Sequence, residues 1–201
     1  MPTFTLDTFT KNLPLWEKIL DEPYKNSFVN ERTNILDIGV GEGPSTIWFA
    51  ETLINHPKSK VYSVDGWWQK ETERRFDFNI ADSSWSHRVI KMKGSVPHIL
   101  CELAIKETGW TKFKVIHYNY TTNSIDALNI ISMAFSLLLK DDGVLVINNY
   151  DSEHKINLLG GIAVHYKEAL LFLQRLYAGK FEVLSSDKLL VLKKLAPEQI
   201  L

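Results

Sequence analysis

The fold is decided by the stretch Asn34-Ile35-Leu36-Asp37-Ile38-Gly39-Val40-Gly41-Glu42-Gly43-Pro44-Ser45-Thr46. The apolar run from Ile35 to Ile38 is too short for a helix, so it predicts a buried strand. Glycines alternate over the next residues, and their missing Cβ atoms allow a sharp turn and the close approach of a ligand. Pro44 is typical of the first position of a helix, where a missing N–H costs nothing. The stretch therefore predicts a strand, a glycine loop and a helix in succession.

A strand–glycine loop–helix unit most often binds a nucleotide or a nucleoside. The dinucleotide pattern would require a third glycine at position 44, which is proline here. Asp37 places a carboxylate at the mouth of the loop, which would repel a pyrophosphate and suits a cationic ligand. For this stretch taken alone, a glycine-rich turn without any ligand is the alternative.

A second acidic residue at a strand end supports the prediction of a ligand site. The alternating run from Lys60 to Asp65 predicts another strand, and a helix from Pro44 to Asn55 would connect it to the first. In open α/β sheets, an acidic residue at the end of the second strand accepts hydrogen bonds from ribose hydroxyls. The glycine loop and Asp65 together predict a site for a nucleoside-type ligand.

The rest of the chain continues the alternation of strands and helices. A helix is expected over residues 13–20, and it either caps the ligand site or simply packs on the domain. For the charged stretch 70–75 the sequence yields no predicted element. Apolar periodicity and turn residues predict strands over 88–94, 113–119 and 144–147, helices over 96–107, 124–140 and 163–177, and an antiparallel hairpin over 181–184 and 189–195.

This order of elements and the signature Asp-x-Gly-x-Gly-x-Gly from Asp37 to Gly43 resemble the class I S-adenosylmethionine-dependent methyltransferases. The resemblance covers nearly the whole chain and is nearest the small branch of catechol- and caffeoyl-CoA-type O-methyltransferases. It implies a Rossmann-like α/β fold with a seven-stranded sheet, parallel except for one strand, a C-terminal antiparallel hairpin and helices on both faces. The length of the chain predicts a single methyltransferase-like domain over residues 1–201, with 1–30 as an N-terminal helical cap segment.

The resemblance implies S-adenosylmethionine as the cofactor. Asp37 and the glycine loop would hold its amino-acid end and Asp65 its ribose. The Gly94–Ser95 loop would border the adenine, with a plain turn as the alternative. Trp67 would stack on the adenine, unless it simply covers the edge of the sheet. The expected cofactor-binding residues are Asp37, Gly39, Val40, Gly41, Gly43, Ser45, Thr46, Asp65, Gly66, Trp67, Gly94, Ser95 and Asn119.

The metal site of that branch is altered in this chain. The branch binds a divalent cation through an Asp after strand four and an acidic pair after strand five. The matching positions here are Asn119, Asn148 and Asn149. An amide offers a carbonyl oxygen but no charge, so we expect no metal. The expected catalytic residues are these three and His117, with His154 and His165 as further candidate bases; a core histidine is the alternative for His117.

Three functions are compatible with these residues. The first is a metal-independent methyltransferase acting on an unidentified small-molecule acceptor, which is our prediction. The alternative is a catalytically inactive S-adenosylmethionine-binding subunit that regulates or partners another enzyme. The third is a fold without a working pocket, and the paired carboxylates Asp37 and Asp65 argue against it.

The composition of the chain limits the classes of partner that we expect it to bind. The chain has 201 residues and a net charge of −1 from 23 basic and 24 acidic residues, and its basic residues occur in pairs rather than stripes. We therefore expect no nucleic-acid partner. The apolar runs are shorter than the ~20 residues that a membrane span requires, so we expect no membrane partner. The sequence shows no signal peptide and has a single cysteine, Cys101. These features predict a cytoplasmic protein. A homo-oligomer or a protein partner stays open.

Overall fold

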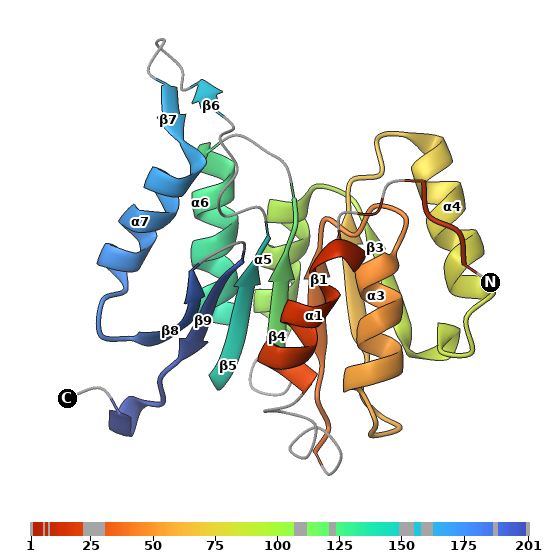
Figure 1. The fold of residues 1–201 in the computed structure, drawn as a ribbon, viewed down its shortest axis with the longest axis horizontal. Coiled ribbons are helices and arrows are strands. Elements are labelled where there is room, and N and C mark those ends of the chain that lie inside the picture. The colour runs from red at the N-terminus through yellow and green to blue at the C-terminus, as the bar shows by residue number, and fades with distance from the viewer. Residues whose placement is uncertain are drawn as a thin grey trace. The chain divides into compact units, whose positions relative to one another are not determined.

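The computed structural model describes residues 2–5, 7, 9–21, 31–106, 112–120, 124–148, 155–157, 163–186 and 189–199. Its chain divides into two compact units, Met1–Ser95 and Val96–Leu201. Both units contribute strands to a seven-stranded mixed sheet (Figure 1). Within the described ranges, no helix has the length and apolar character needed to cross a membrane.

The first unit contributes three parallel strands, in the spatial order β3-β2-β1. They are β1 (Ile35–Ile38), β2 (Val61–Asp65) and β3 (Val89–Lys93). All four residues of β1 are buried, as the apolar run predicts. Because Ile38 is in register with Val64 and the strands are parallel, the glycine loop emerges at the same edge as Asp65.

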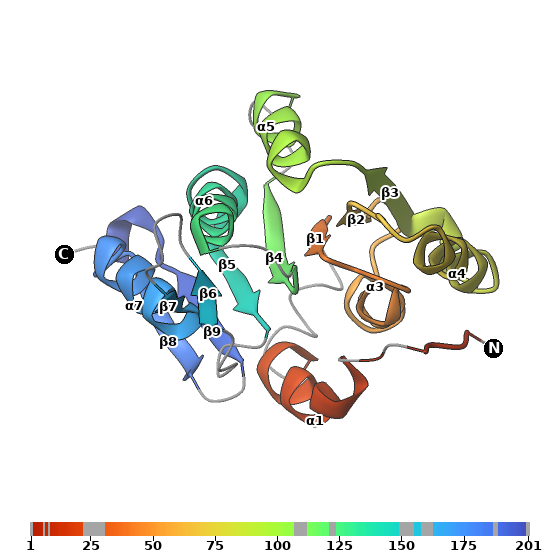
Figure 2. The same ribbon diagram turned by 90° about the horizontal axis from the view of Figure 1, so that it is seen from above.

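The N-terminal helix packs on the helix that follows the glycine loop. The helix α1 (Leu13–Trp16) continues as a π-helical segment (Glu17–Asp21), and α3 (Pro44–Trp48) continues likewise over Phe49–Leu53. The two lie side by side (Figure 2). The aromatic rings of Phe9, Trp16, Trp48 and Phe49 meet there with centroids 5.0 to 6.2 Å apart. This apolar cluster holds α1 against α3.

One helix of the first unit was not predicted. The helix α4 (Lys70–Ala81) lies beside β3 (Figure 1). Half of its residues are charged, and among its apolar residues Phe76 is the one that is fully buried. Ion pairs from Lys91 of β3 to Glu73 and Asp77 join the helix to the strand. An apolar stripe this narrow gives little periodic signal in the sequence.

The second unit contributes four strands, in the order β4-β5-β9-β8. They are β4 (Phe113–Tyr118), β5 (Leu139–Ile147), β8 (Phe181–Ser186) and β9 (Leu190–Lys194). β4 and β5 are parallel, whereas β9 is antiparallel to both of its neighbours. The predicted C-terminal hairpin is therefore present, and one strand runs against the others.

Helices cover the strands of this unit as well. They are α5 (Val96–Lys106), α6 (Ser124–Met133), with a π-helical continuation over Ala134–Leu138, and α7 (Tyr166–Leu176). Ile131, Leu170 and Leu173 of α6 and α7 meet apolar residues of β5, β8 and β9 in a common core.

Two boundaries in the second unit differ from the prediction. The helix predicted over 124–140 ends at Leu138, and residues 141–143 lie inside β5 rather than between elements. The predicted helix over 163–177 begins only at Tyr166, because Ala163–His165 form a short strand, β7. β7 pairs with β6 (Lys155–Asn157) in an antiparallel ribbon that was not predicted.

Candidate functional site

The glycine loop has the sharp turn that its sequence predicts. The φ angles of Gly39, Gly41 and Gly43 are +80°, +54° and +94°, in the left-handed region that other residues avoid. The loop is also closed by backbone hydrogen bonds. Gly39 N donates to Val64 O (2.8 Å) and Gly43 N to Val40 O (2.9 Å). The backbone of the loop is thus fixed to the end of β2.

Asp65 joins the loop to the second strand. Its Oδ2 accepts the N–H of Gly41 at 3.0 Å and its Oδ1 accepts the N–H of Trp67 at 2.8 Å. The residue is half-buried. Since a carboxylate oxygen can accept two hydrogen bonds, each oxygen keeps capacity for a ligand hydroxyl. The predicted ribose-binding group therefore stands directly at the glycine loop.

Trp67 supports the loop through its side chain. Its indole Nε1–H donates to Gly41 O at 2.9 Å. The backbone N–H and C=O of Gly41 are therefore bound by Asp65 at the end of β2 and by Trp67 just after it. The ring is 3% exposed, with Phe76 at a centroid distance of 4.8 Å and the Lys91 ammonium at 4.9 Å from its centroid. A ring buried this deeply offers little surface for stacking on a base.

Asp37, Ser45 and Thr46 form a buried link between β1 and α3. Asp37 Oδ2 accepts the hydroxyls of Ser45 (2.8 Å) and Thr46 (2.7 Å), and all three residues are buried. The two hydroxyls therefore point at Asp37 rather than out of the helix N-terminus. The link fixes the direction in which α3 leaves the loop.

The remaining predicted residues of this unit lie around the same loop. Gly94 N donates to Asp65 O at 3.1 Å, which brings the end of β3 to the end of β2. Ser95 follows and is exposed. Val40 is buried against Trp67 and Phe76. A Cβ atom at Gly66 would lie 2.6 Å from the indole nitrogen of Trp68.

In the second unit, two of the three asparagines predicted for the site bind each other. Asn148 Nδ2 donates to Asn119 Oδ1 at 3.1 Å, and Asn148 is 2% exposed. Asn148 N also donates to Tyr118 O at 2.9 Å. Asn149 lies outside the described residues. Neutral amides thus occupy the ends of β4 and β5, where the resemblance implies carboxylates.

His117 is an interior residue of its unit. It is fully buried in β4 and in register with Val146 of β5. This placement favours the core-histidine alternative. Of the other candidate bases, His165 is in β7 and His154 lies outside the described residues.

No three or more His, Cys, Asp or Glu side chains gather to form a metal site in the described part of the chain. The predicted independence from a metal stays a prediction, because residues 149–154 are outside that part.

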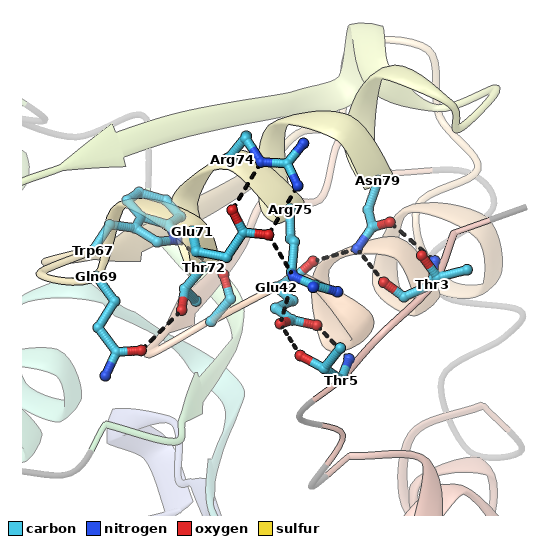
Figure 3. A network of polar contacts seen from close by, with 11 residues as sticks. Thr3, Thr5, Glu42, Trp67, Gln69, Glu71, Thr72, Arg74, Arg75 and Asn79 are labelled. Atoms are coloured by element: carbon cyan, nitrogen blue, oxygen red, sulfur yellow. Dashed lines mark hydrogen bonds and ion pairs between the residues drawn. The ribbon is translucent and has the colours of Figure 1, made fainter.

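The sequence did not reveal one set of residues at the loop. Thr3, Thr5 and Asn79 surround Glu42, which lies in the loop between Gly41 and Gly43 and is 3% exposed (Figure 3). A glutamate inside a glycine-rich turn is the only local signal of this arrangement. Its partners come from distant parts of the chain.

Charged groups on α4 lie beside this set. The hydrogen bonds and charge of Arg74, with the charge of Arg75, lower the pKa of Glu71 to about 2. Hydrogen bonds from Lys91 and Lys93 lower the pKa of Glu73 below its usual value. Both carboxylates therefore stay ionised near neutral pH.

Comparisons with known proteins identify the family of this chain. Residues 36–150, more than half of the chain, match a family described as a methyltransferase domain. No curated protein matches the chain.

Solved structures share the fold at low sequence identity. A structure described as a putative rRNA-methylase from Clostridium thermocellum has 20% identity and a TM-score of 0.64, and the match covers 94% of this chain and 99% of that one. The O-methyltransferase TomG from Streptomyces achromogenes, in complex with SAM, has 18% identity and a TM-score of 0.62, with 86% and 78% covered. An O-methyltransferase from Bacillus cereus, in complex with SAH, has 18% identity and a TM-score of 0.64, with 90% and 81% covered. These similarities confirm the predicted Rossmann-like α/β fold.

Proposed function

The chain belongs to the methyltransferase domain family, and from this premise we propose that it transfers a methyl group from S-adenosylmethionine to a small-molecule acceptor without a metal ion. Two O-methyltransferases that share its fold hold SAM and SAH in their structures. That likeness supports S-adenosylmethionine as the cofactor of this chain.

The placement of Asp65 carries the proposal. Its carboxylate binds Gly41 and Trp67 and still has lone pairs to accept the two hydroxyls of a ribose. The glycine loop next to it lacks Cβ atoms, so a ligand can approach the backbone. The residues present therefore fit a nucleoside cofactor at this edge of the sheet.

We assign the other parts of the cofactor by their position around Asp65. The loop Gly39–Gly43, with the negative charge of Asp37 beneath it, takes the cationic amino-acid end. The backbone of Gly94 and Ser95 borders the adenine. Ser45 and Thr46 act through Asp37, and Trp67 acts by holding Gly41. The side chains of Asp37, Ser45, Thr46 and Trp67 are buried. We therefore assign them the role of positioning the loop.

The bound cofactor supplies an activated methyl group, because its sulfonium is a good leaving group. The protein then has to align the acceptor and, where needed, remove its proton. Asn119, Asn148 and Asn149 are the candidate acceptor-side residues, as hydrogen-bonding amides rather than metal ligands. His154 and His165 are the candidate bases, since His117 is fully buried.

A small acceptor is favoured over RNA by the charge of the chain. A net charge of −1 with scattered basic pairs gives little attraction for a phosphate backbone. The similar structure described as a putative rRNA-methylase keeps RNA as a substrate to be tested.

A second function is supported by the amide pair. Asn119 and Asn148 bind each other and carry no charge, and the histidine of β4 is interior. A protein that binds S-adenosylmethionine and regulates a partner enzyme would need neither a metal nor a base.

Calorimetric titration with S-adenosylmethionine, in excess Mg²⁺ and in chelator, tests the proposal. We expect equal affinity in both conditions. Asp65→Ala should weaken binding by about 1–3 kcal/mol, because ribose hydroxyls lose their acceptor. The control is Glu182→Ala, which removes an exposed carboxylate of β8. Absence of binding by the wild-type protein contradicts the proposal, and unchanged affinity of Asp65→Ala removes the ribose assignment.

An acceptor screen separates the two functions. Phenols, amines, carboxylates and an RNA transcript are incubated with the protein and S-adenosylmethionine, and S-adenosylhomocysteine is measured. If S-adenosylhomocysteine forms with a small molecule, the result supports the proposed methyltransferase. If it forms with the transcript alone, RNA is the substrate. Tight binding without turnover of any acceptor supports the regulatory subunit.

A further inference from the structure

An N-terminal segment is fastened to the outer side of the glycine loop. Thr5 donates both its backbone N–H and its hydroxyl to the carboxylate of Glu42, at 2.6 Å and 2.5 Å (Figure 3). Each oxygen of Glu42 therefore receives one donor from the same threonine, and the two residues are 37 positions apart in the chain.

The carboxylate of Glu42 depends on these donors. It is 3% exposed, and a buried carboxylate is costly unless it is hydrogen-bonded. Arg75 Nε lies 3.7 Å from Oε1, which is an ion-pair distance but too long for a good hydrogen bond. Arg75 thus supplies charge, and Thr5 supplies the hydrogen bonds.

Asn79 makes the second attachment. Its Nδ2 donates to the carbonyl oxygens of Thr3 and Glu42, both at 3.1 Å, and its Oδ1 accepts the N–H of Thr3 at 3.0 Å. The side chain is 1% exposed. One amide from α4 therefore binds the N-terminal segment and the glycine loop at the same time.

Glu42 is placed where such attachments can shape the loop. It stands between Gly41 and Gly43, both with positive φ, and glycines leave the backbone many accessible conformations. Asp65 and Trp67 hold Gly41 from the side of β2. Thr5 and Asn79 hold the next residue, so the loop is fixed at two consecutive positions.

We propose that residues Thr3–Thr5 form a strap whose docking on Glu42 and Asn79 sets the shape of the glycine loop, so that the affinity for the methyl donor depends on the docked strap. Thr5, Glu42 and Asn79 are positioning residues in this arrangement. The inference rests on the function proposed above for the identity of the ligand, but the effect on the loop itself needs no ligand.

The test compares two threonines of the same segment. Thr5→Val removes the hydroxyl donor to Glu42 and keeps the size of the side chain. Thr10→Val is the matched control, because the Thr10 hydroxyl donates to Asp7 and not to the loop. Hydrogen exchange of the amides of residues 39–43 is followed in the ligand-free protein, and the Kd for S-adenosylmethionine is measured by calorimetry.

We expect Thr5→Val to speed exchange in the loop and to raise the Kd about threefold to tenfold. Thr10→Val should match the wild type in both measurements, and Thr5→Ser should restore them. The melting temperatures of the variants show whether any effect is confined to the loop. Glu42→Gln, which removes the charge, should give the larger effect of the same kind.

If the loop amides of both Thr5→Val and Glu42→Gln exchange hydrogen at the wild-type rate, the proposal that the strap sets the shape of the loop is wrong. Faster exchange with an unchanged Kd overturns the coupling to the ligand. If the wild-type protein does not bind S-adenosylmethionine, the proposed function and the affinity part of the inference both fail. The exchange experiment on the ligand-free protein then still decides whether the strap holds the loop.

Discussion

Gly41 and Gly43 have the same kind of backbone conformation but different surroundings. Both φ angles are positive, yet a Cβ atom at Gly41 would meet nothing within 4 Å. At Gly43 it would lie 3.0 Å from the ring of Phe76. The first glycine is required by the backbone alone, and the second by the backbone and by packing.

We predict that Gly43→Ala lowers the free energy of unfolding by about 2–4 kcal/mol, from left-handed strain and overpacking. Gly41→Ala should cost about 1–2 kcal/mol, from the strain alone. Urea unfolding measures both. In a Phe76→Leu background the cost of Gly43→Ala should fall toward that of Gly41→Ala. An equal cost at both positions in the wild-type background would show that Phe76 plays no part.

Single residues differ in how much the sequence reveals about them. The alternating glycines and Asp65 are recognisable because their roles depend on the local backbone and on a strand end. The role of Trp67 cannot be recognised in the sequence, because its indole binds Gly41 O, 26 positions away. The sequence left stacking on the adenine and covering the sheet edge open for Trp67, and in the structure its ring is buried and binds Gly41.

The helix α4 carries charged pairs beside its buried residue Phe76. Glu71 pairs with Arg74 and Arg75 on the same helix, and Glu73 pairs with Lys91 and Lys93 of β3. These side chains are exposed or half-buried, so solvent screens the pairs and each contributes little. Their effect should appear in the pH dependence of stability.

We predict that the protein loses stability as the pH falls from about 4.5 to about 2. The pKa of Glu71 is about 2 in the folded protein and near 4.5 without its partners, so the unfolded chain takes up the proton first. The stabilisation is complete above the unfolded pKa and is lost as the pH falls through the folded one.

Urea midpoints measured across this range check the prediction. The decline should be less steep for Glu71→Gln, and the difference from the wild type should shrink in high salt. Glu51→Gln, in the exposed part of the segment after α3, is the control. An identical acid profile for Glu71→Gln and the wild type would contradict the role of the pair.

Elements with a clear apolar period were predicted well, and those with mixed signals were not. β1 has the predicted bounds, because its run Ile35–Ile38 is too short for a helix and ends at the glycine loop. β5 was predicted too short, since Asp141, Asp142 and Gly143 read as a helix stop. Their strand tolerates them because its register with β4 shifts there and Asp142 takes a φ of +64°.

On the scale of the whole molecule, the candidate residues fall into two sets. The loop residues and Asp65 belong to the first unit, whereas Asn119 and Asn148 belong to the second. Each set is held by its own hydrogen bonds. The single domain predicted from the sequence stays a prediction.

We predict that S-adenosylmethionine raises the melting temperature of the protein. At a concentration one hundred times the Kd, binding to the folded state alone adds about 2.7 kcal/mol. For a chain of this length that corresponds to roughly 5–11 °C. Thermal unfolding with increasing ligand measures the shift, and Asp65→Ala should show a smaller one at the same concentration. A melting temperature independent of the ligand would exclude binding at this site.

The sequence by itself determined the family and the fold. Alternating glycines between a buried strand and a proline-led helix, followed by a second acidic strand end, encode local backbone geometry that few other folds require. Such features can be recognised because each depends on neighbouring residues.

Only the tertiary structure decided how the candidate site is held. Glu42 meets Thr5 across 37 positions, Asn79 meets Thr3 across 76, and Asn148 meets Asn119 across 29. None of these pairs has a periodic or local signal, because each exists only where the folded chain brings two distant polar groups together, one of them buried. Burial then makes each hydrogen bond necessary.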